Sequence, residues 1–195
     1  MKLFFHCLKS LFSRSKAIQY SPPKFAPQIL TRLIIPDGVE GLVGIREWTW
    51  IEDTLTSRNH KYVWNSRYMI ADKTPNKNNK NGIYAYRLGA SVPTWPHHIG
   101  IVEMQGHAEI HSDGMIRAEK CKILVIVVNW GRAHWARRIS SRYNVPVYVS
   151  NFPEQAFREW LLGPDGMKWL NHNFNLLYSK NFNIIEEAEK IIGAK

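Results

Sequence analysis

An unbroken apolar run from Ile123 to Val128 restricts the fold of this chain more than any other feature. Most of its residues are β-branched, which favours a strand, and the lack of polar positions predicts that both faces of the strand are buried. The run is far shorter than the roughly 20 residues that a helix needs to cross a bilayer. We therefore expect residues 123–128 to form an inner strand of a globular domain.

Other segments rich in β-branched and aromatic residues surround this run. We expect strands at Ile45–Ile51, Tyr62–Trp64, Tyr68–Ala71, Ile99–Met104, His107–His111, Met115–Glu119 and Val145–Val149. Residues 82–87 fit either a strand or a first helical turn. Pro146 favours an edge position for the strand that contains it. Polar loops are expected at residues 72–81 and 89–97.

Helical periodicity appears mainly after residue 130. We expect helices at residues 2–13, Gly131–Asn144, Pro153–Leu162, Met167–Tyr178 and Ile184–Ile192. The elements together predict an α+β protein, with a twisted, mostly antiparallel sheet or small β-barrel and flanking helices. We expect three parts: a basic amphipathic helix and linker (1–27), a β-rich core domain (28–150), and a helical extension packed on the core (151–195).

The charge balance favours acidic partners. Lys and Arg number 26 and Asp and Glu 16, which gives a formal net charge of +10. The first acidic residue is Asp37, so the N-terminal segment is a basic arm. Such a field suits nucleic acid, nucleotides, anionic lipid or an acidic protein surface. The N-terminal helix could also contact a partner or a membrane surface.

Cysteine usage and the N-terminus indicate a cytoplasmic protein. The two cysteines, Cys7 and Cys121, exclude a disulfide framework and a cysteine-rich zinc site. Lys9 interrupts the apolar N-terminal stretch, and no small-residue cleavage site follows, so we expect neither secretion nor a transmembrane segment. We expect no cofactor and assign no metal site.

Residues 106–120 predict a β-hairpin around Ser112-Asp-Gly114. A two-residue turn at Asp113-Gly114 would mix polar and apolar side chains on both faces. A three-residue turn with Gly114 in the left-handed region pairs His111 with Met115, Glu109 with Arg117 and His107 with Glu119. We expect this second register, because it gathers one apolar face from Ala108, Ile110, Ile116 and Ala118.

The opposite face of this hairpin is the main candidate site. It collects His107, Glu109, His111, Arg117 and Glu119. We expect Arg117, His107, His111 and Glu119, together with Tyr84, to line a ligand site in which Arg117 clamps a phosphate or carboxylate. One alternative is a solvent-exposed face with cross-strand ion pairs. Another is a metal site using His107, Glu109 and His111.

Basic side chains outside the hairpin are candidates for phosphate contacts. They are Lys73, Lys77, Lys80, Arg132, Arg137, Arg138 and Arg142. The alternative is a solvated basic face. Tryptophans beside these arginines could stack on bases, but most should lie in the core, and we expect one or two to be exposed.

The stretch from about Trp48 to Val149 resembles an uncharacterised family of bacterial and phage proteins. The resemblance rests on five motifs in a fixed order, which are Gly82-Ile-Tyr-Ala85, Ile99-Gly-x-Val102, Gly106-x-Ala-x-x-His111, Gly114-x-x-Arg117-Ala-Glu119 and Arg142-Tyr-x-Val-Pro-Val147. It implies no activity, and the cysteines that family members often carry before the first motif are absent here. The alternation of strands and glycines also resembles, more loosely, the sequence pattern of PUA-like barrels, including ASCH and EVE domains. That resemblance implies recognition of RNA or modified bases in a pocket.

These observations favour binding of nucleic acid or a phosphate-bearing ligand without catalysis. One alternative is an interaction module or inhibitor, from a phage or mobile element, that binds an acidic protein. Another is a hydrolase or nuclease that uses His107 or His111, with Glu109, Arg117 and Glu119 as further candidate catalytic residues.

Overall fold

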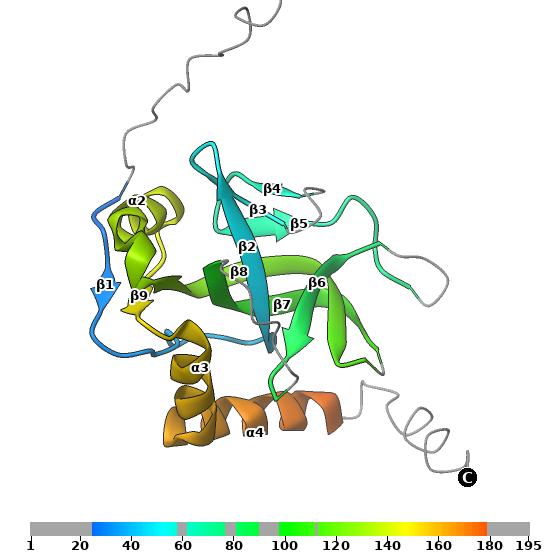
Figure 1. Cartoon of the computed structure of the whole chain (residues 1–195). Coiled ribbons are helices and arrows are strands. Elements are labelled where there is room, and N and C mark those ends of the chain that lie inside the picture. Colours follow the sequence, from blue (N-terminus) through cyan, green and yellow to red (C-terminus); the bar gives the residue numbers. More distant parts are fainter. Residues whose placement is uncertain (1–24, 58–61, 77–80, 90–97, 112, 179–195) are drawn as a thin grey trace, which may run out of the picture.

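The computed structural model describes residues 25–57, 62–76, 81–89, 98–111 and 113–178. The helices expected at residues 2–13 and Ile184–Ile192 lie outside these ranges. The strands are β1 (Ile29–Leu30), β2 (Leu42–Ile51), β3 (Thr54–Thr56), β4 (Val63–Trp64), β5 (Tyr68–Ile70), β6 (Ile83–Arg87), β7 (His98–Ile110), β8 (Met115–Asn129) and β9 (Val147–Ser150). The helices are the 3₁₀ turn η1 (Trp130–Arg132), α2 (Ala133–Tyr143), α3 (Pro153–Leu162) and α4 (Pro164–Tyr178) (Figure 1).

The described strands form a mixed, mostly antiparallel sheet that partly closes into a ring. Strand β8 pairs with β6 and with β7, and both of these pair with β2. The last contact is short, because β2 and β6 pair only at Gly44 with Arg87 and at Ile45 with Tyr86. The expected α+β fold with a mostly antiparallel sheet is therefore confirmed, and residues 83–87 are a strand.

Strands β7 and β8 are longer than the sequence suggests. The strands expected at Ile99–Met104 and His107–His111 are one strand, as are those expected at Met115–Glu119 and Ile123–Val128. The register between β7 and β8 shifts twice, and at the second shift Gly106 adopts a positive φ of 74°. A bulge absorbs extra residues without ending the ladder, so the irregular sequence at these points does not separate two strands.

The run in β8 is buried on both faces, as expected. Val125 contributes to one hydrophobic core and Ile126 to the other, and both are fully buried. Helix α2 covers the Ile126 side with Ile139 and Tyr143. Helix α3 covers the Val125 side with Trp160. Alternation of side chains along β8 thus supplies both cores of the molecule.

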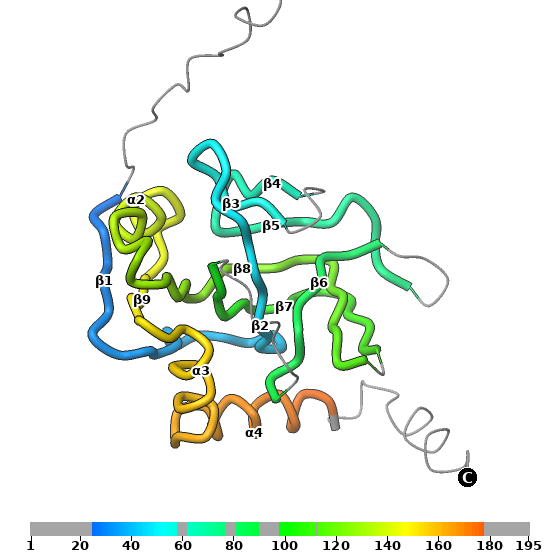
Figure 2. Tube along the Cα trace, in the orientation of Figure 1, coloured from blue at the N-terminus to red at the C-terminus, as the bar shows by residue number. Residues whose placement is uncertain are grey.

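Strand β9 is internal, so the expected edge position is wrong. It pairs in parallel with β8 on one side and with β1 on the other, as the traces of β1 and β9 in Figure 2 show. Pro146 precedes the strand, so its missing N–H removes no ladder bond. Its carbonyl accepts a hydrogen bond from the Ile126 N–H at 3.1 Å.

Helix α4 is fastened to β2 through the side chain of Asn173. The amide oxygen accepts the Val43 N–H at 2.7 Å, and the amide nitrogen donates to the Val43 carbonyl, also at 2.7 Å. The Asn173 amide therefore acts as a strand partner for Val43, next to the point where β6 begins to pair with β2. The helix begins at Pro164, earlier than the expected Met167, because proline is well suited to a first helical turn.

The Tyr143 hydroxyl links α2 to two strands. It accepts the Leu55 N–H at 2.7 Å and donates to the Trp64 carbonyl at 2.8 Å. The side chain is buried, and this burial raises the pKa of the Tyr143 phenol. The neutral hydroxyl satisfies two backbone groups that water cannot easily reach.

Replacing Tyr143 with Phe should destabilise the fold by about 1–3 kcal/mol, because two buried backbone groups lose their partner. Urea unfolding measures this loss. Tyr148→Phe is the matched control, because the Tyr148 hydroxyl has no hydrogen bond to a described residue. Equal losses in the two variants would contradict the role assigned to Tyr143.

A buried carboxylate holds the segment that enters β2. Glu103 accepts the N–H groups of Glu40 at 2.8 Å and Gly41 at 2.9 Å, and Lys122 Nζ lies 3.2 Å from its other oxygen. Burial raises the pKa of Glu103, but hydrogen bonds from Gly41, Gln105, Glu40 and Lys122 outweigh burial and bring the pKa below its ordinary value.

Glu103 should make stability fall in acid. Its folded-state pKa is below the unfolded value, so its stabilisation is complete above the unfolded pKa and is lost as pH falls through the folded pKa. Glu103→Gln should be less stable at neutral pH and should lose less stability between about pH 6 and pH 3. Chemical unfolding across this range tests the expectation. Glu40→Gln, at an exposed carboxylate, should retain the wild-type acid slope.

Candidate functional site

The hairpin between β7 and β8 has the expected three-residue turn. Glu109 pairs with Arg117 and Ile110 with Ile116. The His111 N–H donates to the Met115 carbonyl at 2.9 Å, and Gly114 has a φ of 83°. The register argued from one-sided burial is therefore confirmed, since Ile116 is fully buried.

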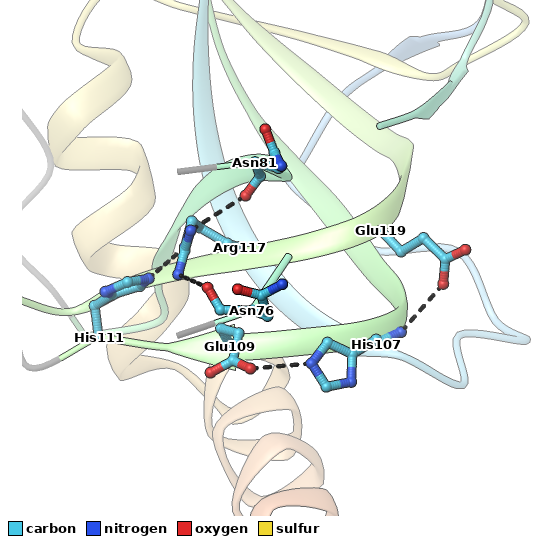
Figure 3. A network of polar contacts seen from close by, with 7 residues as sticks. All are labelled: Asn76, Asn81, His107, Glu109, His111, Arg117 and Glu119. Atoms are coloured by element: carbon cyan, nitrogen blue, oxygen red, sulfur yellow. Dashed lines mark hydrogen bonds and ion pairs between the residues drawn. The ribbon is translucent and has the colours of Figure 1, made fainter. Parts of the chain in front are cut away.

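Arg117 lies on the polar face of the hairpin but is buried, with only 2% of its surface exposed. Its guanidinium donates to the carbonyls of Asn76 at 3.1 Å and Asn81 at 3.3 Å, and to Nε2 of His111 (Figure 3). It also lies 5.8 Å from the ring centroid of Tyr84. Arg117 therefore joins the hairpin to the two chain segments on either side of residues 77–80.

The contact with Arg117 defines the hydrogen-bonding role of one His111 nitrogen. A guanidinium can only donate hydrogen bonds, so Nε2 of His111 must act as an acceptor. In this arrangement Nε2 of His111 is occupied by Arg117.

His107 is the more exposed histidine of the face. Its Nε2 lies 3.0 Å from Oε1 of Glu109, and its side chain is 52% exposed. The expected direct pairing with Glu119 is altered by the bulge, because Gln105 pairs with Lys120 and Ala108 with Ala118. The His107 backbone N–H instead points to the Glu119 carboxylate at 3.5 Å (Figure 3). The His107–Glu109 pair therefore includes a half-exposed histidine, whereas Arg117 on the same face is buried.

The face offers no three-ligand metal site among the described residues. No group of three or more His, Cys, Asp or Glu side chains within the described ranges is placed to hold an ion. The alternative that used His107, Glu109 and His111 fails because Arg117 occupies Nε2 of His111.

Arginines of η1 and α2 differ in their surroundings. Arg138 Nη2 is 2.5 Å from Asp53 Oδ2, and the Arg142 guanidinium lies 6.0 Å from the Tyr143 ring centroid. Arg132 lies 5.5 Å from the ring centroid of Trp135. Arg137 is exposed on α2. Lys73 is exposed in the segment after β5, and Lys77 and Lys80 lie outside the described residues.

Two large aromatic side chains are exposed where neighbouring parallel strands end. Trp130 follows β8 and is 67% exposed, and Phe152 follows β9 and is 68% exposed. Asn129 organises both turns: its Oδ1 accepts the Gly131 N–H at 2.9 Å and its Nδ2 donates to the Asn151 carbonyl at 3.2 Å. Trp130 fits the expectation that one or two tryptophans are exposed.

Sequence reasoning missed a pocket beside β2 and β6. The cavity measures about 420 Å³, and its lining includes Arg46, Glu47, Tyr62, Tyr84 and Tyr86. Of these, only Tyr84 was expected at a site. We call this cavity the β2–β6 pocket. The available signal was Arg46 itself, which falls on the same strand alternation as the buried Trp48 and thus places a charge in an apolar row.

Comparison of the chain with protein-family models, curated proteins and solved structures gave no match. Within the described residues, no helix has the length and apolar character needed to cross a membrane.

Replacing Arg117 with Lys should destabilise the fold by about 3 kcal/mol, because one ammonium cannot serve all of the acceptors that the buried guanidinium serves. Arg137→Lys, the same change at an exposed site, should alter the unfolding free energy by less than about 0.5 kcal/mol. Chemical unfolding of both variants is the measurement. Similar small effects would show that Arg117 is not a structural anchor.

Proposed function

We propose that the protein binds single-stranded nucleic acid along the surface formed by Trp130, Arg132, Arg137 and Phe152, which we call the aromatic–basic edge. The exposure of Trp130 carries the proposal. The other tryptophans of the sheet and helices include Trp48 and Trp64, which are fully buried. An exposed indole beside an exposed phenyl ring supplies flat surfaces on which bases can stack.

The charges around these rings suit a phosphate backbone. Arg132 and Arg137 lie on η1 and α2, immediately after Trp130 in the chain. Arg138 forms an ion pair with Asp53, so we assign it a smaller contribution to phosphate binding. The net charge of +10 adds long-range attraction to a polyanion. Stacking favours a single strand, because paired bases keep their faces covered.

The position of the rings is fixed by the fold. Asn129 and Ser150 pair at the ends of β8 and β9, and the Asn129 side chain holds the turns that follow both strands. A rigid stacking surface loses little conformational entropy on binding. This preorganisation supports a binding role.

Binding of a fluorescein-labelled oligothymidylate, followed by anisotropy, tests the proposal. Trp130→Ala should weaken binding by about five- to a hundredfold, the loss of one base stack. Phe174→Ala is the control, because Phe174 is 56% exposed on α4, away from the aromatic–basic edge. Its affinity should match that of the wild type.

The salt dependence supplies a second readout. Arg137→Ala should reduce the slope of log affinity against log salt by about 0.7, as expected for one phosphate contact on a single strand. Lys168→Ala removes a largely exposed charge from α4 and should leave the slope unchanged. An affinity that depends neither on salt concentration nor on the Trp130 side chain would overturn the proposal.

A further inference from the structure

The β2–β6 pocket contains a buried cation with unused hydrogen-bonding capacity. Arg46 is 7% exposed. Its Nη1 donates to the Tyr84 carbonyl, and its guanidinium lies 5.4 Å from the Trp64 ring centroid. Neither Nε nor Nη2 has a hydrogen bond to a described residue. A buried donor that lacks a partner is destabilising, so this arrangement favours a ligand that brings acceptors.

The two remaining donors define the shape of the acceptor. Nε and Nη2 lie on one edge of the planar guanidinium, where their N–H bonds are parallel. This edge matches two neighbouring acceptors in one plane. Arginine remains protonated at neutral pH, although burial lowers the pKa of Arg46.

The remaining walls of the pocket suit a flat ring. Tyr62, Tyr84 and Tyr86 contribute aromatic surface, and the volume of about 420 Å³ can enclose a bicyclic base. Glu47 also borders the pocket, but it follows Arg46 directly in β2, so its side chain projects from the opposite face of the strand.

We propose that the β2–β6 pocket binds a 6-oxopurine ring, such as guanine or hypoxanthine. The N7 and O6 atoms of this ring are adjacent acceptors and match the Nε/Nη2 edge of Arg46. Adenine is disfavoured, because its amino group at position 6 is a donor and would face the donors of Arg46. The ring can come from a free nucleotide or from a base within a strand, and the proposal is independent of binding at the aromatic–basic edge.

Calorimetric titration of the full chain with GMP, IMP, AMP and inorganic phosphate tests the ring chemistry. GMP and IMP should bind, and AMP should bind at least about tenfold more weakly, as expected for loss of a bidentate contact. Inorganic phosphate should not displace GMP. Equal affinity for AMP and GMP, or full competition by phosphate, would overturn the proposal.

Variants of the pocket residues test whether GMP binds in the β2–β6 pocket. Arg46→Lys keeps the charge but removes the parallel donors, so GMP affinity should fall at least about tenfold. Arg158→Lys, the matched change at an exposed arginine of α3 outside both proposed sites, should leave GMP affinity unchanged. If Arg46→Lys fails to fold, Tyr62→Leu removes one wall and should also weaken GMP binding. Unchanged GMP affinity in the folded pocket variant would overturn the assignment.

Oligothymidylates that contain one central guanine or one central adenine distinguish the two sources of the ring. A guanine preference that is lost in the folded pocket variant, without binding of GMP, assigns the pocket to a base within a strand. Binding of GMP and IMP assigns it to a free nucleotide. Absence of both GMP binding and a guanine preference would overturn the proposal, whether or not Trp130 contributes to strand binding.

Discussion

The hydrogen bonding of β8 to four other strands is the constraint on which the rest of the structure depends. This 15-residue strand pairs with β5, β6, β7 and β9. Its central residues contribute side chains to both hydrophobic cores, so helices must cover both faces of the strand. Its two ends adjoin the two surfaces that we considered as binding sites. The polar hairpin precedes Met115, and the exposed Trp130 follows Asn129.

Buried polar side chains complete the structure where the strand ladder is interrupted. Asn173 serves as a strand partner for Val43, and Tyr143 joins two strands to α2. Glu103 and Arg117 hold backbone segments that approach the ring from outside. Each of these groups is fully or nearly fully buried, and each bonds backbone groups that need partners away from water. Arg46 differs, because much of its hydrogen-bonding capacity is unused in the described structure.

The parts of the structure that local patterns determine could be predicted. The two-sided burial of Ile123–Val128, the helix Pro153–Leu162 and the register beside Gly114 all follow from periodicity and turn chemistry. The two register shifts between β7 and β8 could not be predicted, because ladder continuity depends on partners distant in sequence. For the same reason the burial of Arg117 and the pocket around Arg46 were missed. Both depend on how strands meet across the ring, and one-dimensional alternation does not encode that geometry.

The central claim is that an exposed indole at the end of β8 contacts a nucleic-acid strand. The most direct measurement is a two-dimensional NMR titration of the tryptophan indole N–H signals with oligothymidylate, with the Trp130 signal assigned from Trp130→Phe. The account predicts a progressive, saturable shift of the Trp130 signal while the buried Trp48 and Trp64 signals stay in place. A Trp130 signal that does not move at saturating oligonucleotide would contradict it.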